Sequence, residues 1–437
     1  MAVTHRSLSI ASENGTFGSL GTDGIPSYSG LTWISIPCER DPIVISGEPV
    51  VSERNDARDG PYFVPSEPDT VWSGSNRVRR RTGQIVCRVD LTTIGSTPAD
   101  YSTNYLGYLL GAGFLTQVPS TNAKADTPTA ITDENRFTPS AAYSEGDIGT
   151  LISTLLNGRS EYSAVTNHNV TGDVTISPAF SSNTYTAVRG LQTWYTPSRN
   201  TSGTYTDSVA FRIDGVNFRS YAYGCILESL SITLDNGRLM GEFTFNSAFI
   251  TDDHGAAQGP VEPSYNDGAA PFFRGAYTVI SDGSPASLTN GTAGETQGRI
   301  ALDCEDFTLT VTNTLTPLGH SNSVLAMSDM EITDVAVELS LTLSTVNTTI
   351  ASDFFNRAVR QIVVGTGPQG DGKGCAIMLP AGMLTVDPSA YDVSGNDIVR
   401  QQLTYQQSRY AGDYSGDTSA VYETNAGCSP FRLGLGI

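Results

Sequence analysis

The sequence predicts a mainly β protein in which one unit occurs twice, each copy with a short flanking helix, and a polar β-rich segment is inserted in the first copy. Three observations support this prediction: apolar residues alternate with polar ones at a period of two, turn-forming residues are abundant, and short motifs recur in one order. The chain has 437 residues, of which 44 are Gly and 22 are Pro, a composition that favours short strands joined by turns. Its length suits two or three domains, or one large β-rich domain.

Alternation of apolar and polar residues marks three strand regions. It is clear over Ile85–Leu91 and again over Val335–Leu343. The third region, Ile226–Phe245, is a hairpin, because its two alternating halves flank Asn236-Gly237, and Asn-Gly supplies the positive φ angles of a tight turn. Glu228 falls on the apolar phase of this hairpin, and the pattern alone does not explain it.

Two short helices are predicted, each about ten residues after an alternating strand. The first covers 105–110 with Ser102 or Thr103 as its N-cap, and the second covers 354–363 with Asp353 as its N-cap. Each has apolar residues on one stripe and ends at a glycine.

An internal repeat is the third observation. Motif pairs recur in the same order, 37–41 with 303–307, 89–93 with 337–341, and 224–227 with 374–377. A helix follows the second motif of each copy, which makes duplication the favoured interpretation. The first copy is longer after its helix, and the excess falls in the polar stretch between Leu115 and Ser220, which indicates an inserted surface subdomain.

The composition and the motifs argue against several function classes. The formal net charge is −20, which disfavours a protein that grips nucleic acid through its phosphates. The histidines are dispersed and the cysteines show no C-x-x-C spacing, so we expect buried thiols, no metal, no cofactor and no catalytic residues. No apolar run approaches the ~20 residues of a membrane helix, and the start lacks a signal-peptide pattern, so we expect folding in a cytoplasm and no membrane partner.

The long segment 47–82 mixes charges of both signs. Its charged candidates are Glu53, Arg54, Asp56, Arg58, Asp59, Arg77, Arg79, Arg80 and Arg81. This mixture favours an interface between protein copies over a nucleic-acid patch, with a solvated loop as the alternative.

Four motifs resemble one protein family. They are Ala11–Thr16 around Glu13, Val51–Arg54 ahead of Thr82–Ile85, Tyr223–Ile226 at the start of a hairpin, and the strand Met378-Leu379-Pro380. With these motifs the chain resembles the tail tube, or major tail, proteins of long-tailed bacteriophages, and its repeat resembles the subclass with a duplicated unit. The resemblance covers most of the chain outside the insertion and the residues after Gln407.

This resemblance implies β-sandwich or half-barrel units, each with one flanking helix, packed sideways into rings whose inner strands line a lumen. A duplicated unit implies trimeric rings, which stack into a tube in the virion tail after assembly in the host cytoplasm. The implied partners are other copies of this chain, the tape measure, tail terminator and distal tail proteins, and genomic DNA in transit without specific binding. The resemblance implies a first unit over 1–250, a linker over 251–300, a second unit over 301–407 and a C-terminal tail over 408–437. Within the first unit, 47–82 would be a loop that reaches the next ring, and 116–220 would be an insertion or decoration segment.

The acidic balance fits a channel along which DNA slides, because a negative wall repels phosphates over about 8 Å at physiological salt. Asp90 and Glu338 occupy equivalent motif positions opposite in phase to the apolar residues, and Glu242 has the same phase on the hairpin. We expect these carboxylates to line the lumen, and the alternative is that they face the outer solvent.

Two readings from other classes stay open. A capsid decoration protein would share this composition without needing a duplicated unit. A secreted β-sandwich that binds or cleaves glycans is less favoured, because the sequence has no signal peptide and no disulfide framework, although paired carboxylates that meet only in space remain compatible with the sequence.

Overall fold

The computed structural model describes most of the chain. The described residues are 7–13, 17–19, 30–38, 44–49, 53–56, 60–63, 81–91, 104–113, 115–117, 125–140, 143, 147–168, 172–196, 208–215, 218–235, 238–253, 277–282, 299–319, 327–366, 374–388, 392–394, 398–408 and 429–436. The fold is mainly β, as predicted. Within the described residues, two α-helices, α2 (Tyr105–Gly111) and α3 (Thr348–Asn356), and one 3-10 turn, η1 (Phe17–Ser19), accompany the strands.

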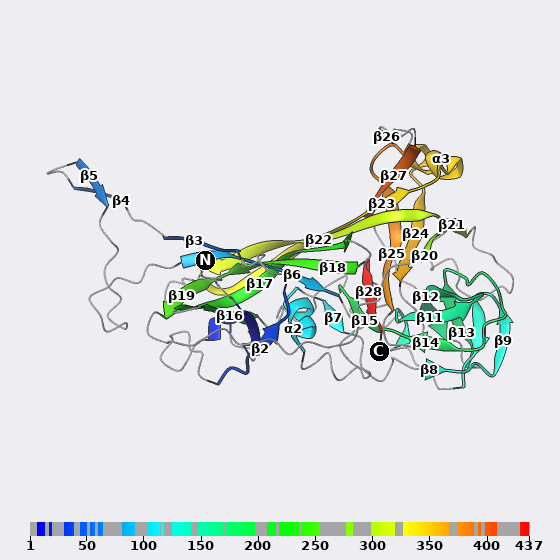
Figure 1. The fold of residues 1–437 in the computed structure, drawn as a ribbon, viewed down its shortest axis with the longest axis horizontal. Coiled ribbons are helices and arrows are strands. Elements are labelled where there is room, and N and C mark those ends of the chain that lie inside the picture. Colours follow the sequence, from blue (N-terminus) through cyan, green and yellow to red (C-terminus); the bar gives the residue numbers. More distant parts are fainter. Residues whose placement is uncertain are drawn as a thin grey trace, which may run out of the picture.

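Two sets of antiparallel strands follow one another along the chain (Figure 1). The N-terminal set contains β1 (Ser7–Ser12), β2 (Ile34–Ile36), β3 (Val44–Pro49), β6 (Arg81–Asp90), β16 (Val209–Gly215), β17 (Phe218–Asp235) and β18 (Arg238–Ser247). The C-terminal set contains β20 (Tyr277–Asp282), β21 (Ile300–Leu302), β22 (Cys304–Gly319), β23 (Met327–Leu343), β24 (Val359–Thr366), β25 (Cys375–Leu384) and β27 (Ile398–Gln407).

The strands of the two sets are paired in the same order. In the N-terminal set the path of neighbours is β2, β1, β16, β17, β18, β6 and β3. In the C-terminal set the corresponding path is β21, β20, β24, β25, β27, β23 and β22. Helix α2 lies between β6 and β16 in the sequence, and α3 lies between β23 and β24. Each strand of the N-terminal set therefore has a counterpart in the C-terminal set, at the same place both in the sequence order and in the pairing order.

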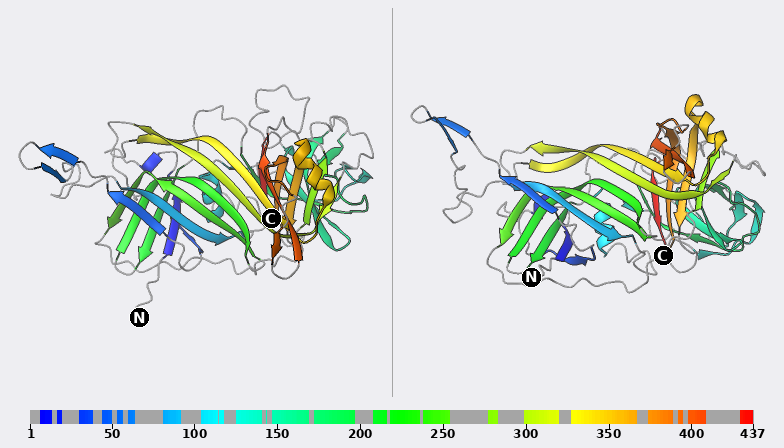
Figure 2. Two further views of the ribbon diagram at one scale, coloured as in Figure 1. Left: turned by 90° about the horizontal axis from the view of Figure 1, so that it is seen from above. Right: turned by 45° about the horizontal axis from the view of Figure 1, so that its top comes forward.

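Strand β17 joins the two sets. Its second half pairs with β18 on one edge, and Ser229–Thr233 pair with Thr308–Thr312 of β22 on the other. The strands β3, β6, β18, β17, β22, β23 and β27 therefore lie side by side in one curled, half-barrel sheet that runs through both sets (Figure 2).

Further strands are added to these sets. β4 (Glu53–Asp56) and β5 (Gly60–Phe63) form a two-stranded hairpin between β3 and β6, and Figure 1 shows it projecting from the body of the molecule. The strands β7 (Thr116–Gln117), β15 (Gln192–Tyr195), β19 (Phe249–Asp253), β26 (Asp392–Ser394) and β28 (Arg432–Leu435) extend the large sheet.

Residues 112–208 separate α2 from β16, whereas only 357 and 358 separate α3 from β24. Most of this insertion forms a seven-stranded sheet with an apolar core of its own. Its strands are β8 (Ala125–Asp126), β9 (Ala130–Asp133), β10 (Arg136–Thr138), β11 (Leu151–Leu156), β12 (Arg159–His168), β13 (Val174–Ser177) and β14 (Val188–Gly190). Within the range 116–220 expected for the insertion, β7, β15, β16 and the first residues of β17 instead belong to the large sheet.

The insertion starts from the N-terminal set but packs on the C-terminal set. Tyr162 of β12 lies against Gly365 of β24 and donates its hydroxyl to Thr366 O at 2.6 Å. A Cβ at Gly365 would lie 2.1 Å from Tyr162 Cδ2, so only glycine leaves room for the ring. Val279 of β20 and Met378 of β25 belong to the same apolar cluster.

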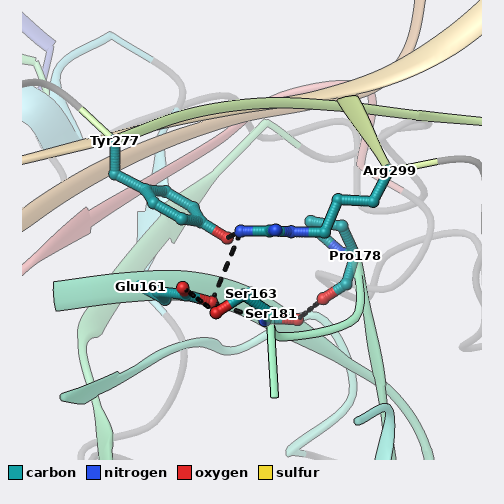
Figure 3. Close-up of polar contacts among 6 residues, drawn as sticks. All are labelled: Glu161, Ser163, Pro178, Ser181, Tyr277 and Arg299. Carbon is teal, nitrogen blue, oxygen red and sulfur yellow. Dashed lines mark hydrogen bonds and ion pairs between the residues drawn. The ribbon is translucent and has the colours of Figure 1, made fainter. Parts of the chain in front are cut away.

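A polar cluster borders this contact, as Figure 3 shows. Arg299 Nη2 lies 3.5 Å from Glu161 Oε2 of β12 and donates to the Tyr277 hydroxyl of β20 at 3.2 Å. Glu161 also accepts a hydrogen bond from Ser181 N at 2.7 Å. Because Glu161 is largely buried, removing Arg299 would leave a buried carboxylate without its charged partner, so the ion pair links the insertion to the residue before β21.

Conversely, the end of the β22–β23 hairpin where β23 begins packs on the N-terminal set. Met327, Met330 and Ile332 of β23 are buried in one cluster with Tyr221 and Tyr223 of β17. Each set is therefore covered by an extension of the other, which adds to the sheet pairing between them.

The structure corrects the predicted helices. Asn104, rather than Ser102 or Thr103, caps α2. The second predicted helix, over 354–363, is misplaced: α3 starts at Thr348 with Asn347 rather than Asp353 as its N-cap, and it ends at Asn356. Arg357 then adopts a left-handed conformation with φ 50°. Residues 359–366 are strand β24, which is buried on both faces from Gln361 to Thr366, so its apolar residues do not alternate with polar ones.

Glu13 ties the start of the chain to the bend of β17. Its carboxylate accepts hydrogen bonds from Gly18 N at 2.8 Å, from Gly224 N at 3.0 Å and from the Ser208 hydroxyl. Gly224 has φ +60°, and a Cβ there would lie 2.8 Å from Ala248 Cβ. Glu13 is buried, so these donors replace hydrogen bonds that water would otherwise make to its carboxylate.

We expect Glu13→Gln to lower the free energy of unfolding by about 2 kcal/mol, because an amide group replaces one accepting oxygen and leaves a buried donor unpaired. Urea denaturation followed by circular dichroism measures this change. Glu242→Gln, at an exposed position, is the matched control and should change stability by less than about 0.5 kcal/mol. Equal effects of the two substitutions would contradict the role assigned to Glu13.

We expect Gly365→Ala to destabilise the protein by about 2 kcal/mol through overpacking against Tyr162. In a Tyr162→Ala background the same substitution should cost less than about 0.5 kcal/mol, because the obstructing ring is absent. A double-mutant cycle by urea denaturation measures both values. The same loss in both backgrounds would show that the ring contact does not set the requirement for glycine.

Candidate functional site

The joined sheet has one face toward the main apolar core and an opposite face that is polar. On β22, Thr308, Thr310, Thr312 and Thr314 alternate with residues whose side chains are buried. The polar face, as defined here, consists of Gln84, Arg88 and Asp90 of β6, Arg238, Glu242 and Thr244 of β18, Glu228, Ser229, Ser231, Thr233 and Asp235 of β17, the four threonines of β22, Glu338, Ser340 and Thr342 of β23, and Gln402, Thr404 and Gln406 of β27. Hydroxyl groups dominate its centre, where β17 meets β22.

A single row of residues crosses the polar face at right angles to the strands. It contains Arg88, Glu242, Ser231, Thr310, Glu338 and Gln406, each paired with the next. Glu242 and Glu338 are exposed and lie three strands apart in this row, which corresponds to about 14 Å. Asp90 lies outside this row. The residue that β6 contributes to the row is Arg88, and Asp90 lies two residues further along the strand.

The arginines of the polar face are held by carboxylates. Arg88 Nη2 donates to Asp235 Oδ2 at 2.9 Å, and Arg238 Nη1 lies 3.6 Å from Asp90 Oδ2. Both ion pairs are partly solvated, so each stabilises the fold by at most about 1 kcal/mol. Their larger effect is to neutralise the cationic side chains on a face that otherwise carries carboxylates and hydroxyls.

A β-bulge explains the position of Glu228. The pairing of β17 with β18 shifts register between Leu227 and Ser229, so Glu228 has no opposite residue. Its side chain turns to the polar face and accepts a hydrogen bond from Gln84 Nε2 at 2.7 Å. The hairpin itself is confirmed, since Asp235 pairs with Arg238 across the two residues Asn236-Gly237.

The segment expected to contact other copies is described only in part. Glu53, Arg54 and Asp56 lie in β4, and Arg81 is the first residue of β6. Arg58, Asp59, Arg77, Arg79 and Arg80 lie outside the described residues. The β4–β5 hairpin pairs with no other strand among the described ones, and it projects from the body of the molecule.

Strand β3 is paired on one edge only among the described strands. Among the pairings of the described strands, β3 pairs with β6 alone, through Val44–Pro49. Its counterpart in the C-terminal set, β22, pairs on both edges, with β23 and with β17. A strand edge of this kind is a template for pairing with another chain.

Two kinds of reactive site are relevant to catalysis by the described residues, a metal centre and a nucleophilic thiol. Among them, no group of three or more His, Cys, Asp or Glu side chains could hold a metal ion. Cys87, Cys225 and Cys375 are buried, and burial raises the pKa of the Cys38 and Cys304 thiols to about 11, so these groups are poor nucleophiles at neutral pH. Neither of the two described α-helices has the length and hydropathy for crossing a membrane.

Sequence reasoning missed two structural residues. Glu13 lies in the motif Ala11–Thr16, but its hydrogen bonds to Ser208 and Gly224 join segments about 200 residues apart and leave no local signal. Tyr162 lies in a polar stretch, and only its glycine partners, Gly365 and Gly374, hint at a bulky neighbour.

Comparison with known proteins adds no relative: no protein-family model matches the chain, and no curated protein is significantly similar to it.

Truncation of two neighbouring residues of β23 should change the free energy of unfolding by very different amounts. Leu339 is fully buried, so Leu339→Ala should lower the free energy of unfolding by about 3 kcal/mol. Glu338 lies on the polar face, so Glu338→Ala should change it by less than about 0.5 kcal/mol. Urea denaturation of both variants checks this, and a large loss for Glu338→Ala would place its carboxylate in a structural contact instead.

Proposed function

We propose that this chain is the structural subunit of the tail tube of a long-tailed bacteriophage, and not an enzyme. The N-terminal and C-terminal sets would each be one tail-tube unit, a sandwich or half-barrel with α2 or α3 as its flanking helix. The observation that carries the proposal is the path of strand pairings that occurs twice in the same order. Two units per chain favour rings of three chains with six similar positions.

The edge of β3 that is unpaired among the described strands supports ring formation. Within the chain, β17 of the N-terminal set adds to β22, the first strand of the joined sheet in the C-terminal set. Because β3 is the counterpart of β22, the C-terminal set of a second copy would add to β3 in the same manner and continue the sheet around the ring.

The polar face suits the wall of a channel for DNA. Its arginines are engaged by Asp235 and Asp90, so they are weak traps for phosphates. Glu242 and Glu338 add negative charge, which repels the duplex over about 8 Å at physiological salt. The hydroxyls between them give a mainly polar, hydrated surface along which a duplex would slide, although Val86 and Met240 also lie on this face.

The β4–β5 hairpin suits a contact between stacked rings. Strands β3 and β22 run in the same direction in the joined sheet, so the connection carrying β4 and β5 leaves from the same end as the shorter connection 320–326. Contacts to the next ring would therefore alternate between a long and a short element. By the same resemblance, the tape measure, tail terminator and distal tail proteins would be the partners inside the tube and at its ends.

Overexpression of the full chain followed by electron microscopy tests the proposal. We expect rings or tubes with three chains per ring, and a reconstruction should place Glu242 and Glu338 on the inner wall. Six whole chains per ring would refute the duplicated-unit assignment. A persistent soluble monomer would refute the tube itself, and these carboxylates on the exterior would refute the channel face.

Deletion of residues 54–76 should leave folded subunits that no longer polymerise, because it removes most of the projecting hairpin and none of the strands of either set. Circular dichroism checks the fold, and sedimentation velocity checks polymerisation. A Gly-Ser replacement of 321–325, in the shorter connection, is the matched control and should weaken stacking less. Normal tubes from the deletion would rule out the hairpin as a stacking element.

A further inference from the structure

Strand β28 fills a slot between two strands that are distant from it in the sequence. It pairs antiparallel with β15 on one edge, from Gln192↔Leu435 to Tyr195↔Arg432. On its other edge it pairs antiparallel with β25, from Cys375↔Leu435 to Met378↔Arg432. Figure 1 shows β28 between these two strands, so it links the end of the insertion to the C-terminal set.

The slot is specific for the sequence of β28. Phe431, Leu433 and Leu435 are fully buried in the main apolar core. On the opposite side, a Cβ at Gly434 would lie 2.9 Å from Leu191 Cδ1 and 3.0 Å from Leu151 Cδ1. The slot therefore accepts a strand with apolar residues at alternate positions and glycine between the last two.

The attachment of β28 differs from that of its counterpart. In the N-terminal set, β19 pairs with the first half of β17 and follows β18 after Ala248 alone, so its pairing is local. β28 pairs with the first half of β25 but is separated from β27 by residues 408–431. The described residues stop at Ser408 and resume at Ser429, and the stretch between them can span about 70 Å when fully extended, long enough to carry the strand to an adjoining copy.

We propose that the slot between β15 and β25 accepts the β28 strand of a second copy of this chain. The same strand from another copy makes the same pairs and buries the same side chains, so exchange loses no contact. The connection lets the strand leave one molecule while its set stays folded, and a high local concentration of neighbouring copies makes exchange competitive with self-docking. The proposal goes beyond tube formation and holds whether or not the chain forms tubes.

Peptide binding to the full-length chain tests the slot. Leu433→Asp with Leu435→Asp places two charges in the core and should keep the chain's own strand out. A fluorescein-labelled peptide of residues 428–437, with Cys428→Ser, should then bind this variant saturably in fluorescence anisotropy. The matched peptide carrying Gly434→Val should bind at least tenfold more weakly, because its side chain meets Leu191 and Leu151. Equal binding of the two peptides, or no binding to a folded variant, would overturn the proposal.

A second experiment avoids any unfolded variant. Both full-length chains carry Cys375→Ala, because Cys375 lies directly opposite residue 435 on β25 and would compete for the disulfide. One of them also carries Gln192→Cys and the other Leu435→Cys, at positions directly opposite in the β15–β28 pairing. After co-refolding and mild oxidation, we expect a disulfide-linked pair of chains on a non-reducing gel. The control is a single chain with both substitutions, which should form the bond within itself. If the control forms its bond and the mixed chains form none, the strand docks only in its own molecule and the proposal fails.

Discussion

The pairing of β17 with β22 is the interaction on which the rest of the structure depends. Its backbone hydrogen bonds carry one sheet from the N-terminal set into the C-terminal set. Because side chains alternate between faces, the register at this junction decides which residues of both sets share a face. A slip of one residue would turn the threonines of β22 into the core and expose Leu309 and Val311. The single polar face therefore exists because this register is fixed.

Several contacts hold the register at the junction. Asn313 of β22 donates its side-chain amide to Leu227 O at 2.8 Å and to Gly113 O at 3.3 Å. Leu227 N donates in turn to Ala112 O at 3.0 Å, at the end of α2. Gly113 lies so close that a Cβ would stand 2.3 Å from Leu227 Cδ2. The bulge in β17 thus falls where a helix end and a buried amide satisfy the freed backbone groups.

Local signals predicted the local parts of this fold. Alternation and Asn236-Gly237 predicted the hairpin correctly, because turn geometry and burial on one face both depend on residues that are close in the sequence. The helix expected over 354–363 failed because β24 is buried on both faces, which removes the alternation that identifies a strand. The outward turn of Glu228 depends on a bulge, and the packing of Tyr162 depends on a glycine in a remote strand. The alternation predicted that the side chains of Glu242 and Glu338 point away from the apolar core. The ion pair of Asp90 with Arg238 depends on how β6 and β18 are aligned, which the alternation within one strand does not reveal.

The position of the insertion also governs the order of events during synthesis. The hydrogen bond from Tyr162 to Thr366 spans 204 residues, so the ribosome completes the insertion well before the surface that receives it. At about 5–20 residues per second, that interval lasts roughly 10–40 seconds. During this interval, the apolar surface of the insertion around Tyr162 lacks the strands on which it packs in the folded protein. Contacts between residues so distant in the sequence also form slowly. Folding is therefore a property of the whole translated chain, and the emerging N-terminal half depends on protection from aggregation until translation has passed β25.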